Sequence, residues 1–126
     1  MSKRDYLWLI SGCLSLVIFW HNQAKASDWS IADKQRQVAY TVLHIMDWAQ
    51  TRNIARHSDW YEVNPIMGKR PSQATVNQYF ATTLLLHYIV VDRLPPSLRR
   101  KFQVGTITIQ AYTVGRNHSL GIQMRF

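Results

Sequence analysis

The fold is decided by residues 72–96, which read SQATVNQYFATTLLLHYIVVDRLPP. Ser72 is a good helix N-cap, because its side chain can accept a hydrogen bond from the first turn. Apolar positions then recur at helical spacing along one stripe, which comprises Val76, Phe80, Thr83 or Leu84, His87 and Val91. Pro95 and Pro96 end the pattern, since proline lacks the amide hydrogen that a helix needs. The stretch therefore predicts a helix over about residues 73–94.

A second helical pattern precedes this stretch, from about Asp33 to Arg56. Ser30 and Asp33 resemble a capping box, with an acid in the place of the usual Glu or Gln. An apolar stripe at helical spacing predicts the buried face of this helix, and it comprises Val38, Val42, Ile45 and Ala49. Apolar residues on the opposite side indicate a helix that is covered on more than one side.

The C-terminal segment is compatible with two structures. Residues 105–109 and 120–126 alternate between apolar and polar types, as in the strands of a hairpin. A third helix from Pro96 to about Val114 is the alternative that we favour, because two helices bury little surface and a short connection favours an antiparallel neighbour. The sequence thus predicts a small, mainly α domain of two to three helices, with a β-hairpin as the other possibility.

Residues 1–26 have the three parts of a cleavable secretory signal peptide. Two cations, Lys3 and Arg4, precede an apolar run over residues 6–20, and Ala24-Lys25-Ala26 forms an A-x-A cleavage signal. We expect cleavage after Ala26, which leaves residues 27–126 as a single domain exported to the periplasm or to a membrane of the bacterial envelope.

Two other fates of the N-terminal segment stay open. Residues 10–13 match a lipoprotein box, which would make Cys13 a lipidated N-terminus. The segment could also remain as an anchor, although its apolar run is shorter than the roughly 20 residues that a spanning helix needs.

The composition limits both partners and chemistry. The chain has a formal net charge of +8, and its single cysteine lies before the expected cleavage site, so the exported domain has neither a disulfide nor a thiol nucleophile. Phospholipid head groups or wall polymers are the anionic partners available in the envelope, and we expect no contact with nucleic acid. The histidines lack the spacings that are typical of metal sites, so we expect no metal and no cofactor.

Three residues are candidates for chemistry. Asp47 lies in the middle of an apolar helical stretch, where we expect it to accept hydrogen bonds from the loop that contains Asn64 and Pro65. Asp47 and Glu62 together resemble the carboxylate pairs that perform general acid–base catalysis in glycoside cleavage. His87 lies at the centre of its apolar stripe, which is typical of a core histidine but also leaves it within reach of a catalytic pair.

The loop between the two clear helices carries the candidate binding residues. Trp60 and Tyr61 are flanked by cations, including Lys69 and Arg70, and aromatic side chains beside cations suit a membrane interface. Asn64 can close an Asx-type turn onto Gly68 or its neighbours.

Three patterns in this region resemble a known group of sequences. They are D-x-x-Q-T at residues 47–51, E-x-N-P-x-x-G-x-x-P-S at residues 62–72 and Tyr79-Phe80. The same patterns occur in small uncharacterised exported proteins of bacteriophages and bacteria. The resemblance covers about residues 47–126, and it implies a shared architecture and a set of special residues, not a reaction.

These features favour a binding role over a catalytic one. We expect an exported, basic, non-enzymatic domain that contacts an anionic membrane surface or another envelope protein. The first alternative is a cell-wall or lipid hydrolase that uses Asp47 and Glu62. The second is a small integral membrane protein whose short helices pack as a bundle.

Overall fold

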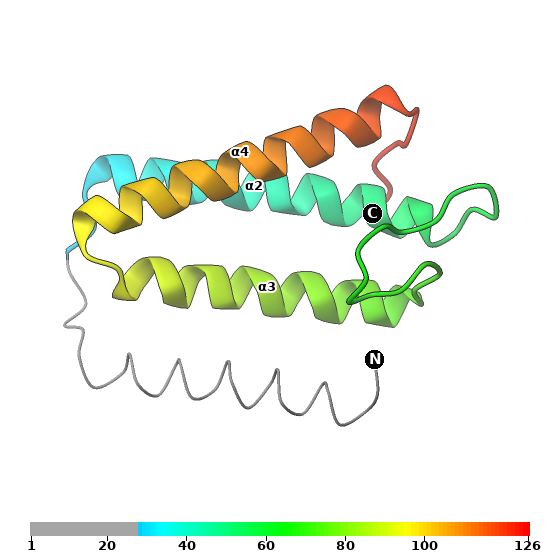
Figure 1. The fold of residues 1–126 in the computed structure, drawn as a ribbon, viewed down its shortest axis with the longest axis horizontal. Helices are drawn as coiled ribbons and strands as arrows, with labels where there is room; N and C mark the ends of the chain where they lie inside the picture. Colours follow the sequence, from blue (N-terminus) through cyan, green and yellow to red (C-terminus); the bar gives the residue numbers. More distant parts are fainter. Residues whose placement is uncertain (1–27) are drawn as a thin grey trace.

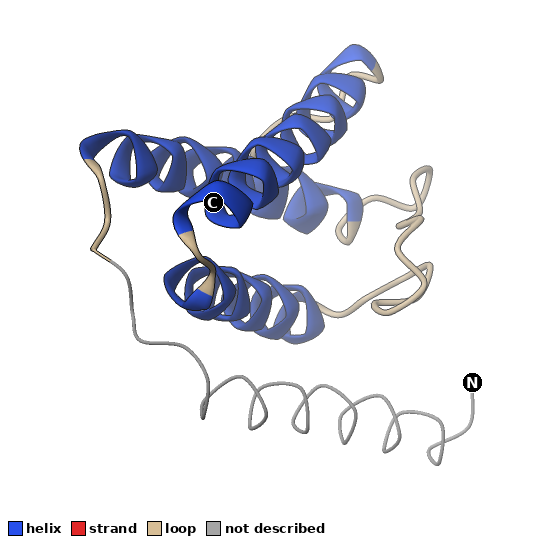
Figure 2. Ribbon diagram, turned by 60° about the vertical axis from the view of Figure 1, so that its left-hand side comes forward, coloured by secondary structure: helices blue, strands red, loops and turns tan. Residues whose placement is uncertain are grey.

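The computed structural model describes residues 28–126, so the expected signal peptide and the alternative role of Cys13 lie outside the described part. Three helices follow one another: α2 (Ile31–Ile54), α3 (Gln73–Arg93) and α4 (Pro96–Ser119). α2 packs against both other helices, and most extensively against α4, which crosses it (Figure 1). The mainly α fold class is confirmed. The β-hairpin alternative is wrong, because most of that segment continues α4, and the described chain contains no strand (Figure 2).

Local signals in the sequence account for where the helices begin. Ser30 and Asp33 form the expected capping box, in which each side chain accepts a hydrogen bond from the other residue's backbone N–H. The Ser72 hydroxyl accepts from the Thr75 N–H at 3.1 Å and caps α3. Pro96 begins α4, at a position where the missing amide hydrogen costs nothing.

The loop from Ala55 to Ser72 is built on turns. Asn64 Oδ1 accepts from the Ile66 N–H at 3.0 Å, which confirms the Asx turn, and the Gly68 N–H closes a wider turn on the Asn64 carbonyl. Gly68 has a φ of 79°, which a residue with a Cβ rarely adopts. The loop therefore holds a defined shape at the end of the bundle where α2 ends and α3 begins (Figure 1).

The α3 stripe is buried as expected, and at the loop end it forms the small apolar core. Val76 and Phe80 pack there with Met67 of the loop, and Trp48 and Tyr79 lie against them. Further along α3, His87 and Val91 are also buried.

α2 and α4 meet through polar side chains. Gln103 of α4 accepts from Arg36 and donates to the Asp33 carbonyl at 3.0 Å. Near the other end, Gln50 Nε2 donates to the Val114 carbonyl at 3.2 Å, and Asn117 donates to Gln50 Oε1. Hydrogen bonds therefore join the polar side chains of α2 and α4 near both ends of their interface.

The expected buried face of α2 is wrong. Val38, Val42 and Ile45 are 63%, 51% and 41% exposed. Only Ala49 of that stripe is buried, beneath the C-terminal tail, whose Arg125 N–H donates to the Ala49 carbonyl. The physical reason is that the polar face of α2 finds hydrogen-bond partners on α3 and α4, so it faces inward and turns the apolar stripe outward.

Candidate functional site

A cleft of about 820 Å³ lies where the three helices meet the loop, and we call it the acid cleft. Five residues that the sequence singles out line it: Asp47, Trp60, Tyr61, Glu62 and Asn64. The residues that complete its polar lining include Tyr40, His44, Tyr79, Gln110 and Arg116. The structure thus joins the candidate carboxylate pair and most of the candidate binding loop in one cavity.

Asp47 enters the cleft from the middle of α2. Its carboxylate accepts from Gln110 Nε2 of α4 at 2.8 Å. The expected partner was the loop that contains Asn64 and Pro65, and the structure shows a partner on α4 instead. Burial raises the pKa of Asp47 to about 6; the Gln110 hydrogen bond opposes this rise, and the negative charge of Glu62 adds to it. Asp47 therefore exchanges its proton close to neutral pH.

Glu62 faces Asp47 from the loop. The side chain is buried, with 8% of the residue exposed, and its Oε1 accepts from the Asn64 N–H at 2.8 Å. The Glu62 N–H in turn donates to the Lys69 carbonyl. Glu62 is thus fixed by the same turn that shapes the loop, and its charge acts on Asp47.

His87 does not line the acid cleft. Its ring stacks on Tyr40 with centroids 3.5 Å apart, and its nitrogens contact Gln37 and Thr106. Burial, together with the charge of His44, lowers the pKa of His87 to about 4. A neutral, hydrogen-bonded His87 therefore belongs to the interior, and Tyr40 separates it from the cleft.

His44 takes the place in the cleft wall that the sequence suggested for His87. Its Nε2 lies 3.0 Å from the Phe80 carbonyl and 3.2 Å from the Thr83 hydroxyl, and burial lowers its pKa. The sequence offered one signal for this role, since His44 lies three residues before Asp47 and therefore on a neighbouring part of the same helix.

The basic part of the loop lies outside the cleft. Lys69 and Arg70 are exposed; the Lys69 ammonium lies 6.0 Å from the ring centre of Tyr61, and Arg70 donates to the Ser58 carbonyl. Tyr61 is itself exposed, whereas Trp60 is half-buried beside His57. The loop thus presents an aromatic side chain and two cations to its surroundings.

Sequence reasoning missed the contributions of α4 to the cleft. Gln110 and Arg116 come from a segment whose structure was ambiguous. A polar stripe could have revealed Gln110, because Gln103, Thr106, Gln110 and Asn117 follow one another at intervals of three, four and seven residues, as one helical face requires.

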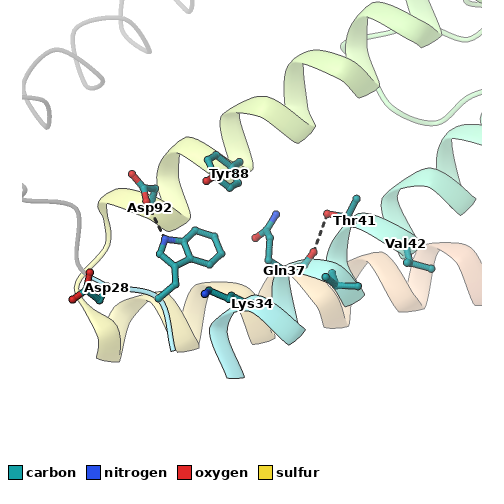
Figure 3. A pocket seen from close by; sticks show the side chains of 9 residues that line it. Asp28, Lys34, Gln37, Thr41, Val42, Tyr88 and Asp92 are labelled. Atoms are coloured by element: carbon teal, nitrogen blue, oxygen red, sulfur yellow. Dashed lines mark hydrogen bonds between the residues drawn. The ribbon is translucent and has the colours of Figure 1, made fainter. Parts of the chain in front are cut away.

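A second hollow, of about 640 Å³, lies between α2 and α3 and shares no lining residue with the acid cleft (Figure 3). Val38 and Val42 line it from α2, and Tyr88 lines it from α3. The Trp29 indole donates to Asp92 at 2.9 Å and stacks on Tyr88 at one end. We call this side of the α2–α3 pair the outer face.

The Lys and Arg side chains of the described residues lie at the two ends of the bundle. No Lys or Arg occurs within residues 37–51, 72–91 or 102–115, and the one carboxylate in these ranges is Asp47. The end where α2 and α4 start holds Lys34, Arg36, Arg93, Arg99, Arg100 and Lys101. The opposite end holds Arg52, Arg56, Lys69, Arg70, Arg116 and Arg125. The bundle therefore has a middle section without cations, in which Asp47 is the one carboxylate, between two cationic ends.

Two further observations concern the described chain alone. Over residues 28–126, no three His, Cys, Asp or Glu side chains come together as a metal site requires. Within the same range, no helix has both the length and the apolar composition of a membrane span.

Comparisons of the chain with protein-family models, curated proteins and solved structures gave no match.

Proposed function

We propose that the protein is an exported, non-enzymatic binding domain that attaches to an anionic membrane surface through the outer face. The observation that carries this proposal is the exposed stripe of α2. Apolar side chains that face water cost free energy, which is recovered when the stripe leaves water.

The charges on α2 suit a lipid head-group region. Lys34 lies four residues before Val38, and Arg52 lies seven residues after Ile45, so both cations continue the line of the apolar stripe. They are about 27 Å apart at the helical rise of 1.5 Å per residue. Leu85 and Tyr88 of α3 are exposed and one turn apart, and Tyr88 lines the same hollow. Asp28 and Asp92 also line the hollow near Lys34, and Arg52 donates to Asn77 at the other end. A flat anionic surface can therefore receive the apolar side chains in the middle, with one cation of α2 near each end of the stripe.

The loop adds to the same attachment. Lys69 and Arg70 at the loop end are exposed beside Tyr61. Each cation near an anionic leaflet contributes about 1 kcal/mol, and the attraction decays within a Debye length. Export of the domain after removal of residues 1–26 is part of the proposal, and it is supported by the two cations, the apolar run and the A-x-A pattern of those residues.

Vesicle sedimentation tests this function. We expect the protein to bind anionic vesicles in low salt and neutral vesicles far more weakly. Val42→Glu should weaken anionic binding about tenfold or more, since it removes an apolar contact and adds a repelled charge. Thr108→Glu adds the same charge at an exposed position of α4 and is the matched control. If the same fraction of the protein sediments with anionic and with neutral vesicles in low salt, the proposal is contradicted.

A hydrolase is the second candidate, and the raised pKa of Asp47 favours it. A carboxylic acid that holds its proton near pH 6 beside a second carboxylate can act as a general acid. It ranks second because His44 and His87 are both engaged in contacts that hold the helices together. Cleavage of wall or lipid substrates that is lost in both Asp47→Asn and Glu62→Gln would support it.

A further inference from the structure

The carboxylates of the acid cleft have no cationic partner in the described chain. Asp47 accepts from Gln110 and Thr51, and Glu62 accepts from the Asn64 N–H. At the opposite end of α2, by contrast, Asp33 pairs with both Arg36 and Arg99. Glu62 is buried and Asp47 is half-buried, and carboxylates removed from water without a counter-charge are unusual, more so in a protein with a net charge of +8.

The one arginine among the described residues that line the cleft does not pair with Asp47 or Glu62. Arg116 lines the cleft from the last turns of α4, but it forms no ion pair with Asp47 or Glu62 among the residues that the structure describes. A hard metal ion would need more converging ligands than Asp47 and Glu62 supply, since Asp59, the third carboxylate of the cleft, is exposed and does not join them as a metal site requires. Within the described chain, Asp47 and Glu62 therefore lack a paired cation, which a ligand could supply.

The walls of the cleft are aromatic. Tyr40 and Tyr79 line it from α2 and α3, Trp60 and Tyr61 line it from the loop, and Tyr112 lines it from α4. The faces of aromatic rings attract cations, and organic ammonium groups are commonly held by several rings beside a carboxylate. At about 820 Å³ the cleft is large enough for a small organic molecule.

We propose that the acid cleft binds an organic ammonium group, with Asp47 and Glu62 as its counter-charges and the tyrosines and Trp60 as its walls. The ammonium group can belong to a lipid head group or to a free amine, since both offer the same chemistry. The cleft shares no lining residue with the hollow of the outer face, but Tyr61 belongs both to the cleft and to the loop of the proposed attachment. A titration with a soluble ligand in the absence of vesicles therefore tests the cleft by itself.

Titration of the purified full chain with choline, followed by NMR, tests the site. The neutral isostere 3,3-dimethyl-1-butanol has the same shape without the charge. We expect choline to cause saturable shifts at Tyr79, Trp60 and Gln110, and the alcohol to cause none. Equal responses to choline and to the alcohol, or no saturable response to choline, would overturn the proposal.

Two variants and a control identify the counter-charges. Glu62→Gln retains an acceptor for the Asn64 N–H, and Asp47→Asn retains one for Gln110. Each should weaken choline binding roughly tenfold or more, because each removes a buried charge opposite the ligand. Asp28→Asn removes an exposed carboxylate at the far end of the bundle and should leave the affinity unchanged. Parental affinity in both cleft variants would overturn the assignment.

Vesicles distinguish the two sources of the ammonium group. Phosphatidylethanolamine added to anionic vesicles should tighten binding, and free choline should reverse that gain, if the ligand is a head group. Choline binding without any such gain assigns the cleft to a free amine. Because choline is soluble, a failure of vesicle attachment leaves this test intact.

Discussion

Asp47→Asn is expected to stabilise the protein at pH 7.5 by about 2–3 kcal/mol. The pKa of Asp47 is raised from 3.8 to about 6 in the folded state, so the folded protein binds this proton more tightly than the unfolded chain does. Above pH 6 the folded state must hold a buried charge, and each unit of pKa shift corresponds to about 1.4 kcal/mol. Asparagine keeps a carbonyl oxygen for Gln110 and removes the charge.

The sign of this effect gives it a pH signature. The stabilisation should be full above pH 6, decline as the pH falls, and vanish below about 3.8, where both states hold the proton in the parent protein. The charged and titratable side chains that share the cleft with Asp47 are His44, Asp59, Glu62 and Arg116. They are common to parent and variant, so the difference between the two unfolding curves isolates Asp47.

Urea unfolding across this pH range measures the difference. Asp59→Asn is the matched control, because Asp59 is exposed at the margin of the same cleft. If Asp47→Asn is no more stable than the parent at pH 7.5, the ionised Asp47 carboxylate does not destabilise the folded state. Such a destabilisation, if measured, supports a functional role, since groups kept in unfavourable environments cluster at functional sites.

Arg99→Met should produce the largest loss of stability, about 3 kcal/mol or more. Arg99 is fully buried at the start of α4, where it pairs with Asp33 at 3.4 Å and donates to the Val91 carbonyl at 2.9 Å. Its guanidinium also lies 5.3 Å from the ring centre of Trp29. Removing one partner of a buried ion pair leaves the other charge and several acceptors without their donor.

Arg100 supplies the comparison for Arg99. It is the next residue along α4, and it is exposed. Arg100→Met should change the free energy of unfolding by no more than about 0.5 kcal/mol, as surface substitutions usually do. Equal stabilities of the Arg99 and Arg100 variants in urea would mean that Arg99 does not join the start of α2 to the turn between α3 and α4.

The boundaries of α2 and α3 could be predicted because local chemistry sets them. Capping by Ser30 and Ser72 and the stop at Pro95 depend on neighbours in the chain alone. α4 was harder, because its β-branched residues and two glycines favour other local structures, and its helix is stabilised by long-range contacts such as Gln110 with Asp47.

The orientation of α2 could not be predicted from its own sequence. The usual rule places apolar stripes inside, but Gln37, His44 and Gln50 each find partners on other helices. These hydrogen bonds depend on residues of all three helices, so the sequence of α2 alone does not predict them.

For the cleft, Asp47 and Glu62 could be identified as a pair from the sequence. The exclusion of His87 could not, because it depends on the ring of Tyr40, whose position no residue spacing reveals.

The attachment of the outer face to lipid is tested most directly by a fluorescent label at Val42. The chain has a single cysteine, so Cys13→Ser combined with Val42→Cys gives one labelled site, and Thr108→Cys in the same background gives the control. On anionic vesicles, a polarity-sensitive dye at position 42 should shift to shorter wavelength and become protected from an aqueous quencher, while a dye at position 108 stays accessible. Equal accessibility of both dyes on vesicle-bound protein would contradict the account.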